Sequence, residues 1–230
     1  MQLPEQIVLG SRSPQRLVLL QTLVEASRIT VCPPLNPDEA GFDGLESSEQ
    51  FEQRLDEIVS AKMDDVVRQL NDGWLGSNDS GPPVTDSPGR SNVFVICADT
   101  TIVGYDIHGR PMALGQPPKD DWQNTVRRWF RDCLTGRPHD VVSGVRVVHI
   151  EDGHVVTSEF RTCRTAVTMR DDAHEWLDWY VETGEPLGKA GGYAIQGAGS
   201  VLVARVEGSI SNVIGLPLED TIEMLRIVGE

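Results

Sequence analysis

Four short stretches of this sequence carry the side chains best suited to chemistry. In chain order they are Ser11-Arg12-Ser13-Pro14-Gln15-Arg16, Ala98-Asp99-Thr100-Thr101, Lys189 to Gly197, and Asn212 to Pro217. The first lies where an apolar run passes into a helix, and such a junction offers backbone N–H groups and a helix dipole to phosphate. It also fits an ordinary helix start, with Ser13 as the N-cap and Pro14 at the first helical position. Because a guanidinium on the first turn can bind phosphate oxygens in pairs, we predict that Ser11 and Arg16 are phosphate ligands.

Asp99 follows the apolar run 93–97, so we expect it at a strand end, on the sheet edge where ligand crevices form in α/β folds. A carboxylate there can hold a divalent ion or take a proton from an attacking water. An aspartate after a strand is also a common helix cap. Thr101-Ile102-Val103 continues as strand, however, which argues against capping.

The glycines of the stretch 189–197 allow the backbone to approach a ligand closely, and Gln196 offers both a donor and an acceptor to a base edge. A glycine-rich turn without a ligand is the alternative. We expect a structural role for 212–217, which starts the last helix.

Apolar periodicity places the elements that must hold these side chains. Helices are predicted at 14–24, 48–70, 120–134, 171–181 and 217–228, and strands at 7–9, 29–31, 93–97, 101–105, 140–150, 155–169 and 201–206. Strands and helices alternate, but the last long pair of strands forms a hairpin about Glu151-Asp152-Gly153. The sequence therefore predicts an α/β fold with a mixed sheet.

Residues 71–92 interrupt this pattern. They are rich in Gly, Ser, Pro, Asn and Asp, and their large apolar residues are Trp74, Leu75 and Val84. We expect a flexible insertion in a single domain spanning residues 1–230.

The net charge of −15 argues against partners that need an extended basic face, namely nucleic acid and anionic membrane. No apolar run reaches the roughly 18 residues of a membrane span, and the first residues show no secretory signal, so we expect a cytoplasmic protein. The four cysteines are expected to be reduced thiols rather than a metal site. An acidic protein that binds a polyanion needs a few focused cations and a divalent metal.

In this order the four stretches resemble those of the Maf family of nucleoside triphosphate pyrophosphatases, from about Ile7 to about Val228. The resemblance implies an inosine-triphosphatase-like fold, with a mixed sheet flanked by helices and an active-site cleft between two lobes. It also implies a hydrolase acting on acid anhydrides, which cuts a nucleoside triphosphate between its α and β phosphates with Mg²⁺ or Mn²⁺. The sequence leaves open whether the protein forms a homodimer.

The resemblance also assigns roles to residues. Asp99 is the implied catalytic acid/base, and Glu39 joins Asp99 in holding the metal. The implied substrate-binding residues are Ser11, Gln15, Arg16, Lys62, Thr100, Gln116, Lys189 and Gln196. Thr100 and Gln196 put the chain nearer the branch acting on dTTP and UTP than the branch acting on 7-methyl-GTP.

Two positions depart from the family. Gln15 stands where a second arginine is usual, and Gln116 stands where the family has a lysine. Lys119 can substitute for that lysine only if the doubled proline before it shifts the loop. With two cations missing, a nucleotide-binding module with weak or no turnover stays open as an alternative function. A third possibility, a scaffold in cell division, rests only on the family's association with septum formation.

Overall fold

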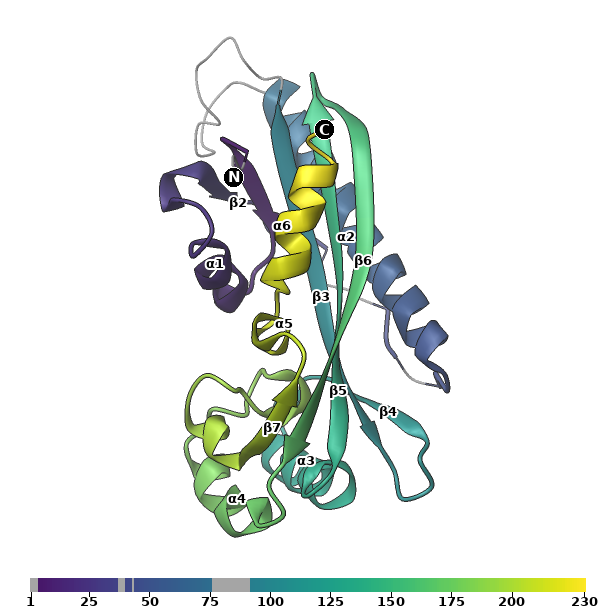
Figure 1. Ribbon diagram of the computed structural model, residues 1–230, viewed down its shortest axis with the longest axis vertical. Coiled ribbons are helices and arrows are strands. Elements are labelled where there is room, and N and C mark those ends of the chain that lie inside the picture. The colour runs from purple at the N-terminus through teal and green to yellow at the C-terminus, as the bar shows by residue number, and fades with distance from the viewer. Residues whose placement is uncertain (1–3, 37–39, 43, 76–91) are drawn as a thin grey trace.

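The computed structural model describes residues 4–36, 40–42, 44–75 and 92–230 (Figure 1). Its sheet has seven strands in the order β2-β1-β3-β5-β6-β7, with β4 paired to β3. The strands are β1 (Ile7–Gly10), β2 (Ile29–Val31), β3 (Val93–Tyr105), β4 (Pro111–Leu114), β5 (Pro138–Glu151), β6 (His154–Met169) and β7 (Val203–Glu207). β1 runs parallel to β2 and β3, whereas the other pairs are antiparallel. The mixed α/β sheet is thus confirmed.

Two layers of helices cover the end of the sheet that carries β1 (Figure 1). α2 (Ser48–Leu75) packs Val59, Met63 and Val66 on one face. On the other face lie α1 (Pro14–Leu20) and α6 (Leu218–Ile227), which bring Leu20 and Met224 to a second core. Each face takes alternate residues of the strands, since successive side chains of a strand point to opposite sides.

A third core lies at the other end of the sheet, where the far halves of β3, β5 and β6 continue (Figure 1). It is covered by α3 (Trp122–Trp129), a π-helical turn η2 (Phe130–Leu134) and α4 (Ala173–Glu182). Two 3-10 turns, η3 (Ala190–Gly192) and η4 (Ala198–Leu202), pack there too, and α5 (Ile210–Ile214) leads back to α6. The molecule therefore has two lobes on one shared sheet.

The structure corrects the predicted end of a strand before Asp99. Residues 93–105 form one continuous strand, so Asp99 lies in its middle. Asp99 nevertheless lies at an open edge of the sheet, as expected, because a gap separates β1 from β4 beside it. β1 pairs with β3 as far as Gly10 opposite Cys97, and the antiparallel β4 pairs with β3 from Ile102, opposite Leu114, to Tyr105, opposite Pro111. On that side of β3, residues 98–101 have no neighbouring strand among the described residues, because the pairing with β1 stops at Cys97 and the pairing with β4 starts only at Ile102.

Element boundaries differ from the prediction at several places. α1 ends at Leu20 rather than at residue 24, and β7 begins at Val203 because Leu202 closes η4. α2 continues through residues 71–75, since each residue added to an existing helix gains a hydrogen bond at little further cost in order. The rest of the predicted insertion, residues 76–91, lies outside the described residues. In the described part of the chain, no helix is long and apolar enough to cross a membrane.

Candidate active site

A cavity of about 1040 Å³ opens at the gap beside β3. Every predicted site residue that the structure describes lines it: Ser11, Gln15, Arg16, Lys62, Asp99, Thr100, Gln116, Lys189 and Gln196. Glu39 lies outside the described residues. The lining comes from α1, α2 and β3 on one side and from segments after β4 and α4 on the other, so the cavity lies between the two lobes.

Asp99 and Thr100 face opposite sides of β3, as neighbours on a strand must. Asp99 meets Lys62 from α2, and Thr100 meets Arg16 from α1. Both still border one cavity. The gap between β1 and β4 explains this, because a ligand there can reach around the open edge of β3 to both faces.

Arg16 ties three segments together at the phosphate-binding corner predicted from the sequence. Its Nη1 donates to Ser11 Oγ at 3.2 Å, and its Nη2 donates to Thr100 Oγ1 at 3.2 Å. Its Nε donates to the carbonyl of Gly215 at 2.8 Å. α1 begins as predicted, with Ser13 Oγ accepting from Arg16 N and Pro14 at the first helical position. The guanidinium is therefore held in one orientation beside the N-terminus of α1.

The fully buried Ser143 supports Thr100 from the neighbouring strand. It lies opposite Thr100 in the pairing of β3 with β5, and the two hydroxyl oxygens are 2.8 Å apart. Thr100 therefore has a fixed hydroxyl that can hold Arg16.

Lys62 and Asp99 form an ion pair, with 2.6 Å between Lys62 Nζ and Asp99 Oδ1. Both side chains are 13% exposed, so the pair is partly removed from water but still open to the cavity. The ammonium orients the carboxylate, and it also places a positive charge where a phosphate could reach it.

The segment 189–197 contains the tight turn η3, which is closed by a hydrogen bond from Gly192 N to the carbonyl of Lys189 at 3.0 Å. Gly191 and Gly192 have φ values of 67° and 69°, which glycine adopts at no steric cost. A Cβ on Gly191 would lie 2.9 Å from Ile102 of β3. Gly191 N also donates to the carbonyl of Gly115 at 3.1 Å, which joins this segment to the loop after β4. That contact places Gln116 in the cavity lining, whereas Lys119 is exposed and is not part of the lining.

The charge of the cavity is opposite to that of the whole chain. Its cationic side chains are Arg12, Arg16, Lys62 and Lys189, and its carboxylates among the described residues are Asp99 and Glu185. Beside it, burial raises the pKa of the Cys97 thiol to about 12, although the positive charges of Lys62 and Arg16 act to lower it. This thiol stays protonated, so it is not a nucleophile. The lining is suited to an anionic ligand.

A divalent metal bound with a phosphorylated ligand fits this donor set. Mg²⁺ is commonly held by one or two carboxylates, with phosphate oxygens and waters completing its shell. Asp99 supplies a carboxylate at the cavity. In the described part of the chain, no group of three or more His, Cys, Asp or Glu side chains could hold a metal by itself. Among the described residues, the protein ligands of such a metal are therefore too few to complete its shell, which phosphate oxygens of the substrate can do.

Three residues of the site were not assigned by sequence reasoning. Arg12 lines the cavity and donates to the carbonyl of Pro34 at 2.5 Å, so it fixes the loop after β2. Its position within the first motif, Ser11 to Arg16, could have indicated from the sequence that Arg12 belongs to the site. Ser143 and Glu185 carried no such signal, because their contacts join segments far apart in the sequence.

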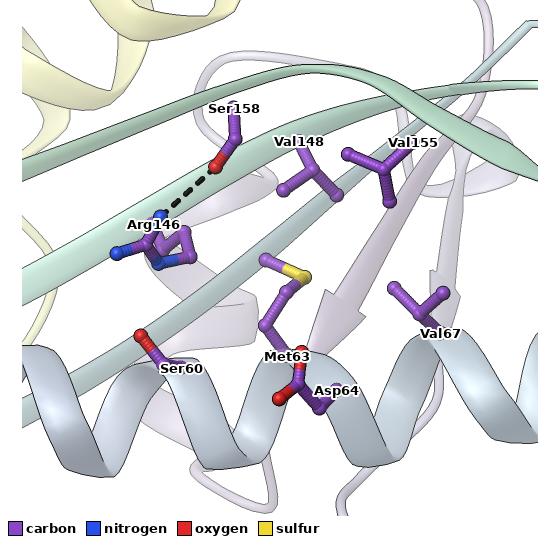
Figure 2. A pocket seen from close by; sticks show the side chains of 8 residues that line it. All are labelled: Ser60, Met63, Asp64, Val67, Arg146, Val148, Val155 and Ser158. Atoms are coloured by element: carbon purple, nitrogen blue, oxygen red, sulfur yellow. Dashed lines mark hydrogen bonds between the residues drawn. The ribbon is translucent and has the colours of Figure 1, made fainter.

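A second cavity, of about 370 Å³, lies between α2 and the β5–β6 hairpin (Figure 2). Arg146 borders it, but its Nη1 donates to Ser158 at 2.9 Å and its Nη2 to Asp56 at 2.5 Å. Its guanidinium also lies over the ring of Phe160. None of the predicted site residues lines this cavity.

Comparison with known proteins identifies relatives over almost the whole chain. A family model described as Maf-like protein matches residues 6–228. A dTTP/UTP pyrophosphatase of Geotalea uraniireducens (strain Rf4) is 34% identical over 232 aligned positions, which cover 100% of this chain and 98% of that protein. One from Anaeromyxobacter sp. (strain Fw109-5) is 34% identical over 97% of this chain and 89% of its own length. One from Myxococcus xanthus (strain DK1622) is 41% identical over 59% of this chain, and that match spans 62% of the relative.

Proposed function

Because this chain belongs to the Maf family, we propose that it hydrolyses nucleoside triphosphates of the dTTP and UTP kind to the monophosphate and pyrophosphate. One observation carries the proposal. The predicted residues described by the structure come from five separate segments and meet at one cavity between the lobes. Its cations suit a triphosphate, and its oriented carboxylate suits activation of water. The cytoplasm, where such nucleotides occur, is the proposed location.

The proposed reaction is an in-line displacement at the α-phosphorus. A water oxygen forms the new bond to phosphorus while the bond to the oxygen bridging the α and β phosphates breaks. Asp99 accepts the proton that the water loses, and pyrophosphate leaves with the bridging oxygen. Arg16 and Lys62 neutralise charge on the phosphates, and most of the acceleration comes from such positioning and neutralisation.

Asp99 and Glu39 are the residues that we propose would hold Mg²⁺ or Mn²⁺. Such an ion, when bound, neutralises charge on the phosphate oxygens and helps to orient the triphosphate. Lys62 keeps the Asp99 carboxylate turned toward the cavity.

Base recognition is assigned to the segment after α4. Gln196 is exposed at the cavity lining, where its amide can donate to and accept from a base edge. Thr100 contributes to substrate recognition indirectly: its hydroxyl accepts a hydrogen bond from Arg16 and so helps to hold that side chain in place.

A nucleotide-binding module with weak turnover is the second candidate. Gln15 and Gln116 both line the cavity, and each is neutral where the family usually has a cation. Two phosphate contacts of the expected site are therefore uncharged in this chain.

Pyrophosphate release from a panel of nucleotides, measured with Mg²⁺ and with Mn²⁺, tests both readings. We expect release from dTTP and UTP, with little from ATP and GTP. Equilibrium binding is measured in parallel with a non-hydrolysable dTTP analogue. Tight binding without release would favour the binding module, and the absence of both would exclude a nucleotide site.

A further inference from the structure

Glu185 places a carboxylate in the lining of a cavity that the proposed function fills with a triphosphate. A negative charge there repels the phosphates, so we expect the Glu185 carboxylate to have a role other than binding them. The hydrogen bonds of Glu185 indicate such a role. Glu185 Oε2 accepts from Ala198 N at 2.9 Å, and Glu185 Oε1 accepts from Gly199 N at 2.8 Å. Both carboxylate oxygens are thus engaged by backbone N–H groups of the turn that follows.

The turn from 194 to 199 is shaped around this carboxylate. A Cβ on Gly197 would lie 2.4 Å from Glu185 Oε2, so any other residue there would push the carboxylate out of its place. Gly197 also has a φ of 144°, in the region that favours glycine. At the other end of the turn, the hydroxyl of Tyr180 accepts from Ala194 N at 3.2 Å. Tyr180 and Glu185 come from α4 and the residues just after it, so the lobe's own core holds both ends of the turn.

Gln196 lies between these two anchors. Its amide can distinguish bases only if its direction is fixed, because a freely rotating amide presents donor and acceptor with equal ease. Ala194 is held on one side and Ala198 on the other, which leaves the Gln196 backbone little freedom to turn.

We propose that Glu185 is a positioning residue for base selection: by binding the N–H groups of Ala198 and Gly199, it fixes the turn that aims Gln196 at the nucleobase. This inference rests on the proposed function, in which Gln196 contacts the base. It assigns Glu185 no contact with the phosphates and no part in the hydrolytic step.

Glu185→Gln tests the proposal, because the amide nitrogen of glutamine would face a backbone N–H that needs an acceptor. The matched control is Glu182→Gln, which removes the same charge from an exposed residue outside the cavity lining. Each variant is assayed with dTTP and with methyl triphosphate, which has the phosphates but no base. For Glu185→Gln we expect kcat/KM on dTTP to fall about tenfold or more, mainly through KM, with methyl triphosphate hydrolysis unchanged.

The Gln196→Ala variant adds a second arm. If Glu185 acts through Gln196, the double variant should lose no more on dTTP than Gln196→Ala alone. Additive losses would overturn the proposal, and so would an equal loss on methyl triphosphate, which would place Glu185 at the phosphate end. Unchanged dTTP kinetics in a folded Glu185→Gln variant would overturn it as well.

Two measurements keep the proposal testable under other outcomes. If the variant fails to fold, amide hydrogen exchange in the unaltered protein decides: slow exchange at Ala198 and Gly199 is expected, and fast exchange at both contradicts the proposal. If the unaltered protein hydrolyses no nucleotide, the proposed function fails by itself. The ratio of dissociation constants for dTTP and methyl triphosphate, compared between the unaltered protein and Glu185→Gln, then tests the role of Glu185 separately.

Discussion

At the scale of single residues, the site depends on side chains whose partners come from distant segments. Asp99 is oriented by Lys62 from α2, and Arg16 by Ser11, Thr100 and Gly215. The Asp99 carboxylate and the Arg16 guanidinium are thus held by contacts with the rest of the fold before any ligand binds. Such preorganisation is what allows charged groups to act on a transition state without further rearrangement.

Replacing Asp99 by Asn should abolish most turnover while the fold persists. Loss of a catalytic acid or base typically lowers rates by about 10²–10⁴-fold. Pyrophosphate release and thermal unfolding should be measured together. Asp64→Asn, an exposed aspartate on α2 outside the main cavity, serves as the control. Near-normal release from a folded Asp99→Asn variant would remove Asp99 from the mechanism.

The neutral residue Gln116 offers a gain-of-function test. It lines the cavity, whereas Lys119 is exposed and outside the lining, so Gln116→Lys should add a phosphate contact and Lys119→Ala should change little. A charge-assisted contact can raise kcat/KM by about tenfold when its geometry is met. Steady-state kinetics on dTTP measure both variants. The reverse pattern, with harm only from Lys119→Ala, would mean that Lys119 moves into the site with substrate.

At the scale of elements, the site depends on where strands stop. β1 ends at Gly10, opposite Cys97, and β4 ends at Leu114, opposite Ile102, so the middle of β3 has one open side on which the cavity forms. The turn η3 then closes over this opening, and it can approach β3 only through a residue without a side chain.

Gly191→Ala should therefore destabilise the fold more than Gly109→Ala. Both glycines have positive φ, so alanine pays a similar backbone cost of roughly 1 kcal/mol at each. Gly109 has open space around it, while a Cβ on Gly191 would press on Ile102 at 2.9 Å. Overpacking of that kind typically costs about 1–3 kcal/mol more. Urea unfolding of both variants measures the difference, and equal midpoints would show that η3 does not pack tightly on β3.

His139 on β5 should make stability depend on pH. It is fully buried, 2.8 Å from the Tyr193 hydroxyl, and burial lowers its pKa to about 4. In the unfolded chain His139 takes up a proton near pH 6.5, whereas in the folded protein it does so only near pH 4. The free energy of unfolding should therefore fall as the pH drops from about 6.5 to about 4. The full loss is roughly 3 kcal/mol.

Denaturant unfolding at several pH values between 7 and 4.5 checks this expectation. The His139→Gln variant should show a flatter profile, because glutamine does not titrate. His154→Gln, at an exposed position of β6, should keep the original slope. Identical slopes for the unaltered protein and His139→Gln would assign the pH dependence to other groups.

At the scale of the whole molecule, two lobes share the long strands β3, β5 and β6 (Figure 1). β5 pairs with β3 from Val93 to Val103 and with β6 along its length, so neither lobe has a sheet of its own. The cavity between the lobes is therefore built on a continuous sheet and not on a hinge of loose chain.

Unfolding should accordingly be one cooperative transition. Trp122, Trp129, Trp176 and Trp179 all lie on α3 or α4 of one lobe, so a Trp74→Phe variant leaves fluorescence as a reporter of that lobe. Far-ultraviolet circular dichroism reports both lobes. The two signals should give the same midpoint in urea. A separate, earlier fluorescence transition would mean that the lobe carrying α4 unfolds by itself.

The sequence determined the order and type of most elements, and it singled out nine of the residues that line the main cavity. Alternation and helical periodicity are local, so they predicted the helices, the hairpin of β5 and β6, and the cap of α1 at Ser13. The motifs identified the residues that line one cavity, even though their distance from one another was not visible.

Tertiary structure alone decided how those residues meet. The sequence placed Asp99 at a strand end, but β3 continues through it, because pairing with β5 on the other side supports the strand where β1 has stopped. Ser143 and Glu185 likewise gain their roles from partners 43 and 13 residues away. Local pattern reports which face of an element is apolar, whereas pairing and hydrogen bonding between distant segments depend on the whole packed chain.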